Sequence, residues 1–210
     1  FHSRVFAVYR FLKVASPTPN PNVSDHYNSP AMGILYSSCI PNRDCKIVIM
    51  GLEGGGKTSL INWIREGKAP EQPPQVTYSF NYFEYSKYGY NMKIFDIGGT
   101  DRKTTFWRHF LAGAHALIYV VDSSDFTRLG EAREQLHKIL GFESMQGVRT
   151  LIFANKIDLQ ERKICKVASV ELIRKELGLD NSFHQWCIEP CSAVTGAGVD
   201  TGLKWVLQGY

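Results

Sequence analysis

The sequence lacks most of the features that mark membrane-spanning, extracellular or repetitive proteins. No apolar run reaches the roughly 18 residues that a transmembrane helix requires, and no internal repeat is present. The five cysteines are odd in number and irregularly spaced, so they form no disulfide framework and indicate a reducing compartment. Acidic residues are absent before Asp25. What is left is the composition of a globular protein with an unusual N-terminal part.

Charge and composition favour one globular domain preceded by a tail. Of the 210 residues, 44% are hydrophobic and 21% are charged, which is too apolar for a disordered chain and too mixed for a coiled coil. The net charge is +4, and residues 1–46 contribute +3 of it through five basic and two acidic residues. The remainder is nearly neutral, so we expect no nucleic-acid partner. The basic tail is compatible with an anionic membrane surface.

The chain divides into three zones. Residues 1–31 form an N-terminal extension that ends in a linker rich in Pro, Asn and Ser, and residues 32–44 precede a domain over 45–210. Within that domain, apolar runs predict strands at 46–50, 91–97, 116–122, 150–155 and 186–191. Helical patterns lie between them, at 57–66, 128–140, 167–177 and 199–207. With an antiparallel hairpin starting at 77–85 as one edge, the pattern predicts a doubly wound α/β domain with a mostly parallel sheet.

The strongest local signal is GLEGGGKT at 51–58, which fits the phosphate-binding pattern G-x-x-x-x-G-K-[ST] between a strand and a helix. Glycines let backbone N–H groups converge on a phosphate chain, and the N-terminus of the following helix adds its positive dipole end. Lys57 would reach the β- and γ-phosphates, and the Thr58 hydroxyl would ligate Mg²⁺. The nucleotide-binding residues predicted here are Gly51, Leu52, Glu53, Gly54, Gly55, Gly56, Lys57, Thr58 and Ser59.

Two further motifs follow predicted strands. In DIGG, Asp96 can hold a Mg²⁺-bound water and Gly99 can offer its N–H to a γ-phosphate. In NKID, which contains Asn155 and Lys156, the carboxylate of Asp158 can accept both N1–H and N2–H₂ of guanine. Adenine lacks that pair of donors, so NKID selects guanine and argues against an ATP-dependent P-loop kinase. Each motif alone is also compatible with a polar turn, and their order along the chain favours nucleotide binding.

The order GLEGGGKT, DIGG, NKID and Cys-Ser-Ala at 191–193 resembles a Ras-superfamily GTPase. The resemblance is closest to the ADP-ribosylation-factor (Arf/Arl) branch and runs from about Met32 to Tyr210, with matching stretches at 107–110, 120–125, 131–136 and 153–159. It implies a P-loop NTPase fold whose six-stranded sheet has helices on both faces and one antiparallel edge strand. It also implies GTP, GDP and Mg²⁺ as ligands, and effector, exchange-factor and activating proteins as partners. The expected function is a switch in membrane traffic, cytoplasmic and peripheral on an intracellular membrane.

The resemblance assigns further residues. Thr77 falls at the switch I threonine, which in the family ligates Mg²⁺ and senses the γ-phosphate, and Ser192 and Ala193 match the loop that packs on guanine. Three aromatic residues fall at the positions of the family's effector-binding surface, although large rings at such spacing are also typical of core packing: Phe80, Phe95 and Phe110.

Thr100 departs from the family, because most members have a glutamine there that positions the attacking water. Threonine is too short for that role, so no catalytic residue is assigned and slow intrinsic GTP hydrolysis is predicted. His109 or Arg102 could substitute for the missing side chain. The alternative class is a GTP-binding scaffold or receptor subunit that does not hydrolyse GTP.

The N-terminal part allows two interpretations. Met32-Gly33-Ile-Leu-Tyr-Ser fits the N-myristoylation pattern, so Gly33 could carry an acyl chain if translation starts at Met32, with Cys39 as a palmitoylation candidate. Residues 1–31 would then be non-native upstream sequence. If they are part of the protein, Gly33 is internal and the acid-free residues 1–15 resemble a transit peptide.

Overall fold

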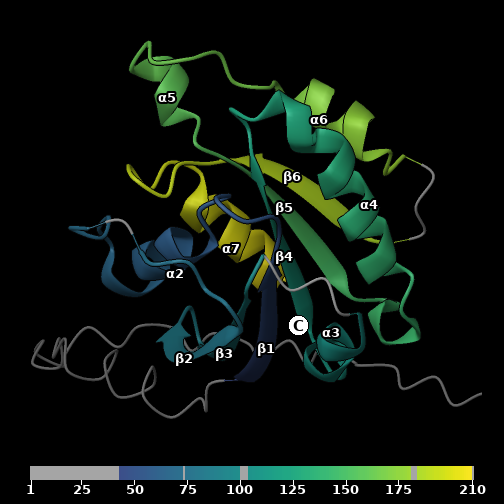
Figure 1. Cartoon of the computed structure of the whole chain (residues 1–210). Helices are drawn as coiled ribbons and strands as arrows, with labels where there is room; N and C mark the ends of the chain where they lie inside the picture. The colour runs from purple at the N-terminus through teal and green to yellow at the C-terminus, as the bar shows by residue number, and fades with distance from the viewer. Residues whose placement is uncertain (1–42, 73, 100–103, 181–183, 210) are drawn as a thin grey trace, which may run out of the picture. The chain divides into compact units, whose positions relative to one another are not determined.

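A computed structural model describes residues 43–72, 74–99, 104–180 and 184–209, all within one compact unit, Pro41–Tyr210. Six strands of this part form one sheet in the order β2-β3-β1-β4-β5-β6 (Figure 1). Their bounds are β1 Arg43–Met50, β2 Phe80–Lys87, β3 Tyr90–Ile97, β4 Ala116–Asp122, β5 Arg149–Asn155 and β6 Trp186–Pro190. Edge strand β2 pairs antiparallel with β3 and the other pairings are parallel, which confirms the predicted sheet.

The helices of the described residues are α2 Lys57–Glu66, α3 Thr104–Leu111, α4 Leu129–Leu140, α5 Asp158–Glu161, α6 Val170–Leu177 and α7 Val199–Leu207, with 3₁₀ turns η1 Phe126–Arg128 and η2 Glu143–Met145. Helices α2 and α7 have the bounds predicted from the sequence. Helix α6 begins at Val170 rather than 167, because the Ser169 hydroxyl accepts the Leu172 amide at 3.2 Å and caps the helix. None of the helices in the described ranges is long and apolar enough to cross a membrane.

Helices cover both faces of the sheet, as expected for strands that are apolar without interruption. Two hydrophobic core clusters form, one on each face. In β1, Val48 and Met50 pack into the cluster that includes residues of α3, α4 and α6, whereas Ile47 and Ile49 pack into the cluster that includes residues of α2 and α7. Figure 1 shows the two groups of helices on opposite sides of the sheet. Helix α7 packs closely on β5 at Gly202, where a Cβ would lie 2.5 Å from the Phe153 ring.

The topology places the predicted nucleotide-binding motifs at one edge of the sheet. The carboxyl ends of parallel strands meet at the same edge, and ligands of doubly wound folds bind there. The segment 51–56 follows β1, Asp96 is the last residue but one of β3, Asp122 ends β4, Asn155 ends β5 and residues 191–193 follow β6. The fold therefore gathers residues that are more than 140 positions apart in the chain, from Gly51 to Ala193.

Candidate functional site

Backbone geometry explains the glycines of the loop at 51–56. Gly51 has φ +139°, and a Cβ there would lie 2.3 Å from the carbonyl oxygen of Val120. Gly56 has φ +91°, and its Cβ would lie 2.4 Å from Nδ2 of Asn155. Only glycine meets both requirements, a positive φ and a close approach of neighbouring chain. The loop therefore rests against β4 and β5 and ends at the N-terminus of α2.

Two adjoining cavities open on this loop. One, of about 300 Å³, is lined by Glu53, Gly54, Gly56, Lys57, Thr58, Ser59, Pro74, Gln75, Val76, Thr77, Gly99 and Lys156. The other, of about 160 Å³, is lined by Gly56, Ser59, Asn155, Lys156, Asp158, Leu159, Arg162, Ala193 and Val194. They share Gly56, Ser59 and Lys156, so they form two ends of one site. The first cavity is lined by most of the residues predicted to bind phosphate, and the second by Asn155, Lys156, Asp158 and Ala193, which are predicted to bind guanine.

Lys57 lies buried at the phosphate end. Its Nζ donates to the carbonyl oxygens of Gly51 and Leu52, both at 2.9 Å. Burial lowers the pKa of Lys57 to about 8, against an opposing influence of the Asp96 carboxylate. A phosphate in the adjoining cavity would favour the charged ammonium, so this lysine is suited to bind an anion.

Three oxygen-bearing side chains converge beside Lys57. The Thr58 hydroxyl donates to Asp96 Oδ2 at 2.7 Å and lies 3.2 Å from the Thr77 hydroxyl. Asp96 is fully buried, and its Oδ1 has no hydrogen-bond partner within the described residues. A buried carboxylate oxygen without a donor is costly, and a metal-bound water would supply the missing donor. The set of hydroxyl and carboxylate oxygens fits Mg²⁺, which prefers oxygen ligands.

Asn81 belongs to this group and was not predicted from the sequence. It lies opposite Asp96 in the β2–β3 pair, and its Nδ2 donates to Thr77 Oγ1 at 3.3 Å and to Asp96 Oδ2 at 3.4 Å. The register of the hairpin would have indicated Asn81, since a residue opposite Asp96 shares its face of the sheet. The sequence pattern alone predicts a hairpin without fixing that register.

Gly99 completes the phosphate end. A Cβ on Gly99 would lie 2.3 Å from the Glu53 amide nitrogen. The backbone of the DIGG motif therefore packs directly on the phosphate-binding loop, which is the placement needed for its N–H to approach a γ-phosphate.

The guanine end is built around the buried side chains of Asn155 and Asp158. Asp158 Oδ1 accepts the Ser192 hydroxyl at 2.6 Å. Asn155 Nδ2 donates to the Gly55 carbonyl at 2.8 Å, and its Oδ1 accepts the Ala193 amide at 3.0 Å. Lys156 adopts φ +73° and its Nζ pairs with the carboxylate of Asp122. These contacts hold the NKID motif, the 191–193 loop and the phosphate-binding loop together.

The three aromatic residues of the predicted effector surface also come together. Phe80 lies 4.8 Å and Phe95 5.6 Å from Phe110, measured between ring centroids. Phe106, which was not predicted, joins them 4.9 Å from Phe110. Phe80 is 44% exposed, whereas Phe95, Phe106 and Phe110 are partly buried against the core. The cluster thus combines core packing with an exposed edge, and its binding role stays a prediction.

Several predictions fall outside the described residues. They concern Thr100 and its possible substitute Arg102, the start at Met32, the acylation of Gly33 and the status of residues 1–31. The other candidate substitute, His109, lies in α3.

Fold and site together define a P-loop protein of the small GTPase class. The family model of the ADP-ribosylation factor family matches residues 32–210, and the chain belongs to this family. A solved structure with the same fold is that of the small GTPase Arl6 (BBS3) from Trypanosoma brucei with the bound nucleotide analogue GppNp. It has a TM-score of 0.69 and 27% sequence identity, and the match covers 79% of this chain and 96% of that one.

Proposed function

We propose that this protein is a GTP-binding molecular switch of the Arf/Arl type, which cycles between GTP and GDP states and recruits effector proteins. The observation that carries the proposal is the convergence of Thr58, Thr77 and Asp96 beside Lys57, at one end of a site whose other end presents Asp158. Family membership supports the same function.

The phosphate end has the groups that hold a di- or triphosphate. The phosphate-binding loop and the N-terminus of α2 border this cavity, where their backbone N–H groups would be donors to phosphate, and Lys57 contributes a positive charge. Thr58 and Thr77 would ligate Mg²⁺ directly and Asp96 through water. Bound there, Mg²⁺ neutralises charge on the phosphate oxygens. Thr77 and Gly99 are the residues that distinguish GTP from GDP, because their loops order around the γ-phosphate and its metal.

The base end selects guanine. Asp158 is held by Ser192 so that its carboxylate lines the cavity beside Ala193. Guanine would pair both of its donors with this carboxylate, whereas adenine has no such pair of donors to offer it.

Partners and location follow from the same proposal. Phe80, Phe95 and Phe110 would form an effector-binding surface next to Thr77, and exchange-factor and activating proteins would control the cycle. We expect a cytoplasmic protein that associates peripherally with an intracellular membrane and acts in membrane traffic. Acylation of Gly33 would require a start at Met32, and mass spectrometry of the mature N-terminus tests it.

A second candidate function is favoured by Thr100, which stands where the family has its water-positioning glutamine. A protein that binds GTP without hydrolysing it would act as a scaffold or receptor subunit. Multiple-turnover GTP hydrolysis separates the two, since only the switch turns over.

The test of the proposed function is the nucleotide bound to the purified full-length chain, followed by calorimetric titration of nucleotide-free protein with GDP, a non-hydrolysable GTP analogue and ATP in the presence of Mg²⁺. We expect guanine nucleotide in the purified protein, tight binding of GDP and of the GTP analogue, and faster release when EDTA removes Mg²⁺. Preference for ATP, or no binding of guanine nucleotide, would overturn the proposal.

A further inference from the structure

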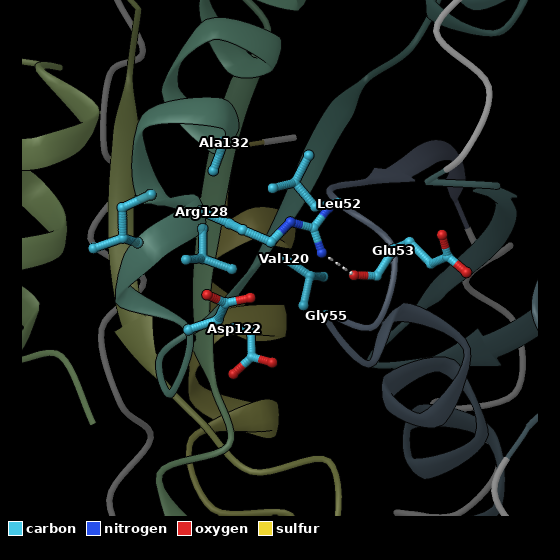
Figure 2. A pocket seen from close by; sticks show the side chains of 10 residues that line it. Leu52, Glu53, Gly55, Val120, Asp122, Arg128 and Ala132 are labelled. Atoms are coloured by element: carbon cyan, nitrogen blue, oxygen red, sulfur yellow. Dashed lines mark hydrogen bonds between the residues drawn. The ribbon is translucent and has the colours of Figure 1, made fainter. Parts of the chain in front are cut away.

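Several carbonyl groups of the phosphate-binding loop accept a hydrogen bond from a side chain. The Gly51 and Leu52 carbonyls accept from Lys57, and the Gly55 carbonyl accepts from Asn155. The donor to the Glu53 carbonyl comes from a different part of the fold. It is Nη1 of Arg128, at 3.0 Å, 75 residues further along the chain. Figure 2 shows the Arg128 guanidinium reaching across to this carbonyl.

The direction of this carbonyl determines the direction of an amide. In a trans peptide the C=O and the following N–H point to opposite sides of the same plane. When Arg128 holds the Glu53 oxygen on its own side of the loop, the N–H of Gly54 is turned to the other side. Glu53 and Gly54 line the cavity predicted to hold phosphate. Gly54 has φ +78°, a conformation in which a glycine peptide flips easily. Without a donor to its carbonyl, nothing among the described contacts fixes this peptide.

Arg128 is itself held in place. It is the last residue of η1, directly before α4, and its Nε donates to Glu131 Oε2 at 2.9 Å. The planar guanidinium offers separate N–H groups to the Glu131 carboxylate and to the Glu53 carbonyl. A lysine ammonium is a single point charge on a flexible stem, so it reproduces this two-sided contact only in part.

The small cavity beside Arg128 is not the ligand site. It has about 20 Å³, room for one water, between apolar side chains of Leu52, Val120, Leu129 and Ala132. Together with Arg128 these side chains line the cavity, while the contact of the guanidinium with the loop lies exposed to solvent. The contact is a charge-assisted hydrogen bond, which is stronger than one between two neutral groups.

We propose that Arg128 is a positioning residue for phosphate binding, which sets the peptide between Glu53 and Gly54 so that its N–H faces the phosphate. This inference rests on the proposed binding of GDP and GTP at the loop. Arg128 does not touch the nucleotide. It acts through the backbone, and its loss weakens the contact to the phosphate chain while leaving the guanine end intact.

The experiment compares full-length Arg128→Met and Arg128→Lys with the natural chain. We expect GDP to dissociate about tenfold faster from Arg128→Met, as the loss of one charge-assisted hydrogen bond predicts, and by an intermediate factor from Arg128→Lys. In ³¹P NMR of bound GDP, the β-phosphate resonance should move more than the α-phosphate resonance. Arg174→Met is the matched control, because Arg174 pairs with Asp180 on the surface at 2.7 Å and lines neither cavity; it should change neither readout.

The outcomes separate the inference from the function on which it rests. If the natural chain binds no guanine nucleotide, the proposed function fails. If it binds and Arg128→Met releases GDP at the natural rate with an unmoved β-phosphate resonance, only the inference fails. If Arg128 only stabilises the fold, Arg128→Met lowers the melting temperature without a selective shift of the β-phosphate resonance. That result would also overturn the inference about Arg128. Should Arg128→Met not fold, Glu131→Gln is the second variant, because it weakens the contact that holds the Arg128 guanidinium from the side of α4. We then expect GDP to be released faster than from the natural chain, by a smaller factor than for Arg128→Met. An unchanged rate of GDP release would count against the inference.

Discussion

Asn81 lies directly opposite Asp96 in the antiparallel pair of β2 and β3, and its amide donates to the carboxylate of Asp96 and to the hydroxyl of Thr77. One side chain thus links the strand that carries Asp96 to the segment that carries Thr77. If the segment that carries Thr77 becomes ordered around a γ-phosphate, the Asn81 hydrogen bonds stabilise that ordered state and not the state without a γ-phosphate.

Replacing Asn81 with alanine should therefore reduce discrimination between GTP and GDP. We expect a non-hydrolysable GTP analogue to bind about three- to tenfold more weakly, as for one or two hydrogen bonds, while GDP affinity changes little. The ratio of the two dissociation constants is the measurement. Asn91→Ala is the control, since Asn91 lies in the same strand pair but accepts from Ser86 at its far end. Equal weakening of both nucleotides would contradict the prediction.

Asp158→Asn should change the preferred base. An asparagine offers one donor and one acceptor, which matches the N1–H and C2 carbonyl of xanthine instead of the two donors of guanine. GTP affinity is expected to fall by roughly 100-fold or more, and XTP binding should appear. Competition titrations with GTP and XTP measure this change. Asp180→Asn on the surface is the control, and it should leave the affinities for GTP and XTP unchanged. Retained GTP preference would show that another group selects the base.

Thr100→Gln should accelerate hydrolysis. A glutamine can contact the attacking water and the phosphate together, which threonine cannot. We expect single-turnover GTP hydrolysis to rise by at least about tenfold, with the affinity for GTP unchanged. Equal rates for the two proteins would mean that Thr100 does not limit the natural chain.

Nucleotide binding should take up protons near pH 8. Burial lowers the pKa of Lys57 to about 8, and a bound phosphate would raise it again. Below pH 8 the lysine is already charged, so little uptake is expected at pH 7. At pH 8 about half of the free molecules must gain a proton, and affinity for GDP declines as pH rises further. Calorimetry in buffers of different ionisation enthalpy measures the uptake, and equal values at pH 7 and pH 8 would refute the prediction.

Gly196→Ala should loosen the guanine end. Gly196 has φ +79°, and a Cβ there would lie 2.0 Å from Trp63 of α2. Gly147→Ala is a matched control, because Gly147 has φ +75° with nothing within 4 Å of the added atom. Both variants incur backbone strain of about 1 kcal/mol or more, and Gly196→Ala should be less stable by a further 1–3 kcal/mol or so from overpacking. Thermal unfolding and GDP affinity measure the difference, and equal melting temperatures would count against a tight contact.

Sequence patterns predicted the parts of the fold that depend on local periodicity. The apolar run of β4 and the bounds of α2 agree with the structure because burial on both faces and a glycine-rich start leave clear signals. Helix α3 was not predicted from periodicity, since it has only eight residues and three aromatic side chains. The motifs around Lys57, Asp96 and Asp158 were found because their chemistry requires fixed spacing, and the structure brings them together.

Other residues of the site carry no local signal. Asn81 depends on the strand register, which a turn pattern does not fix. Arg128 contacts a residue 75 positions away, and in the sequence it resembles any basic residue before a helix. Phe106 joins the aromatic cluster through the orientation of α3, which is a property of packing.

The two amide atoms of Asn155 have a consequence for how the nucleotide is held. Its Nδ2 contacts the phosphate-binding loop at Gly55 and its Oδ1 the 191–193 loop at Ala193, so one side chain links the two loops. We therefore expect recognition of the base and of the phosphates to be cooperative. A nucleoside or pyrophosphate alone should bind more weakly than it would if the two ends contributed additively to the affinity for the whole nucleotide. A partner that displaces one of these loops would therefore disturb the other through Asn155.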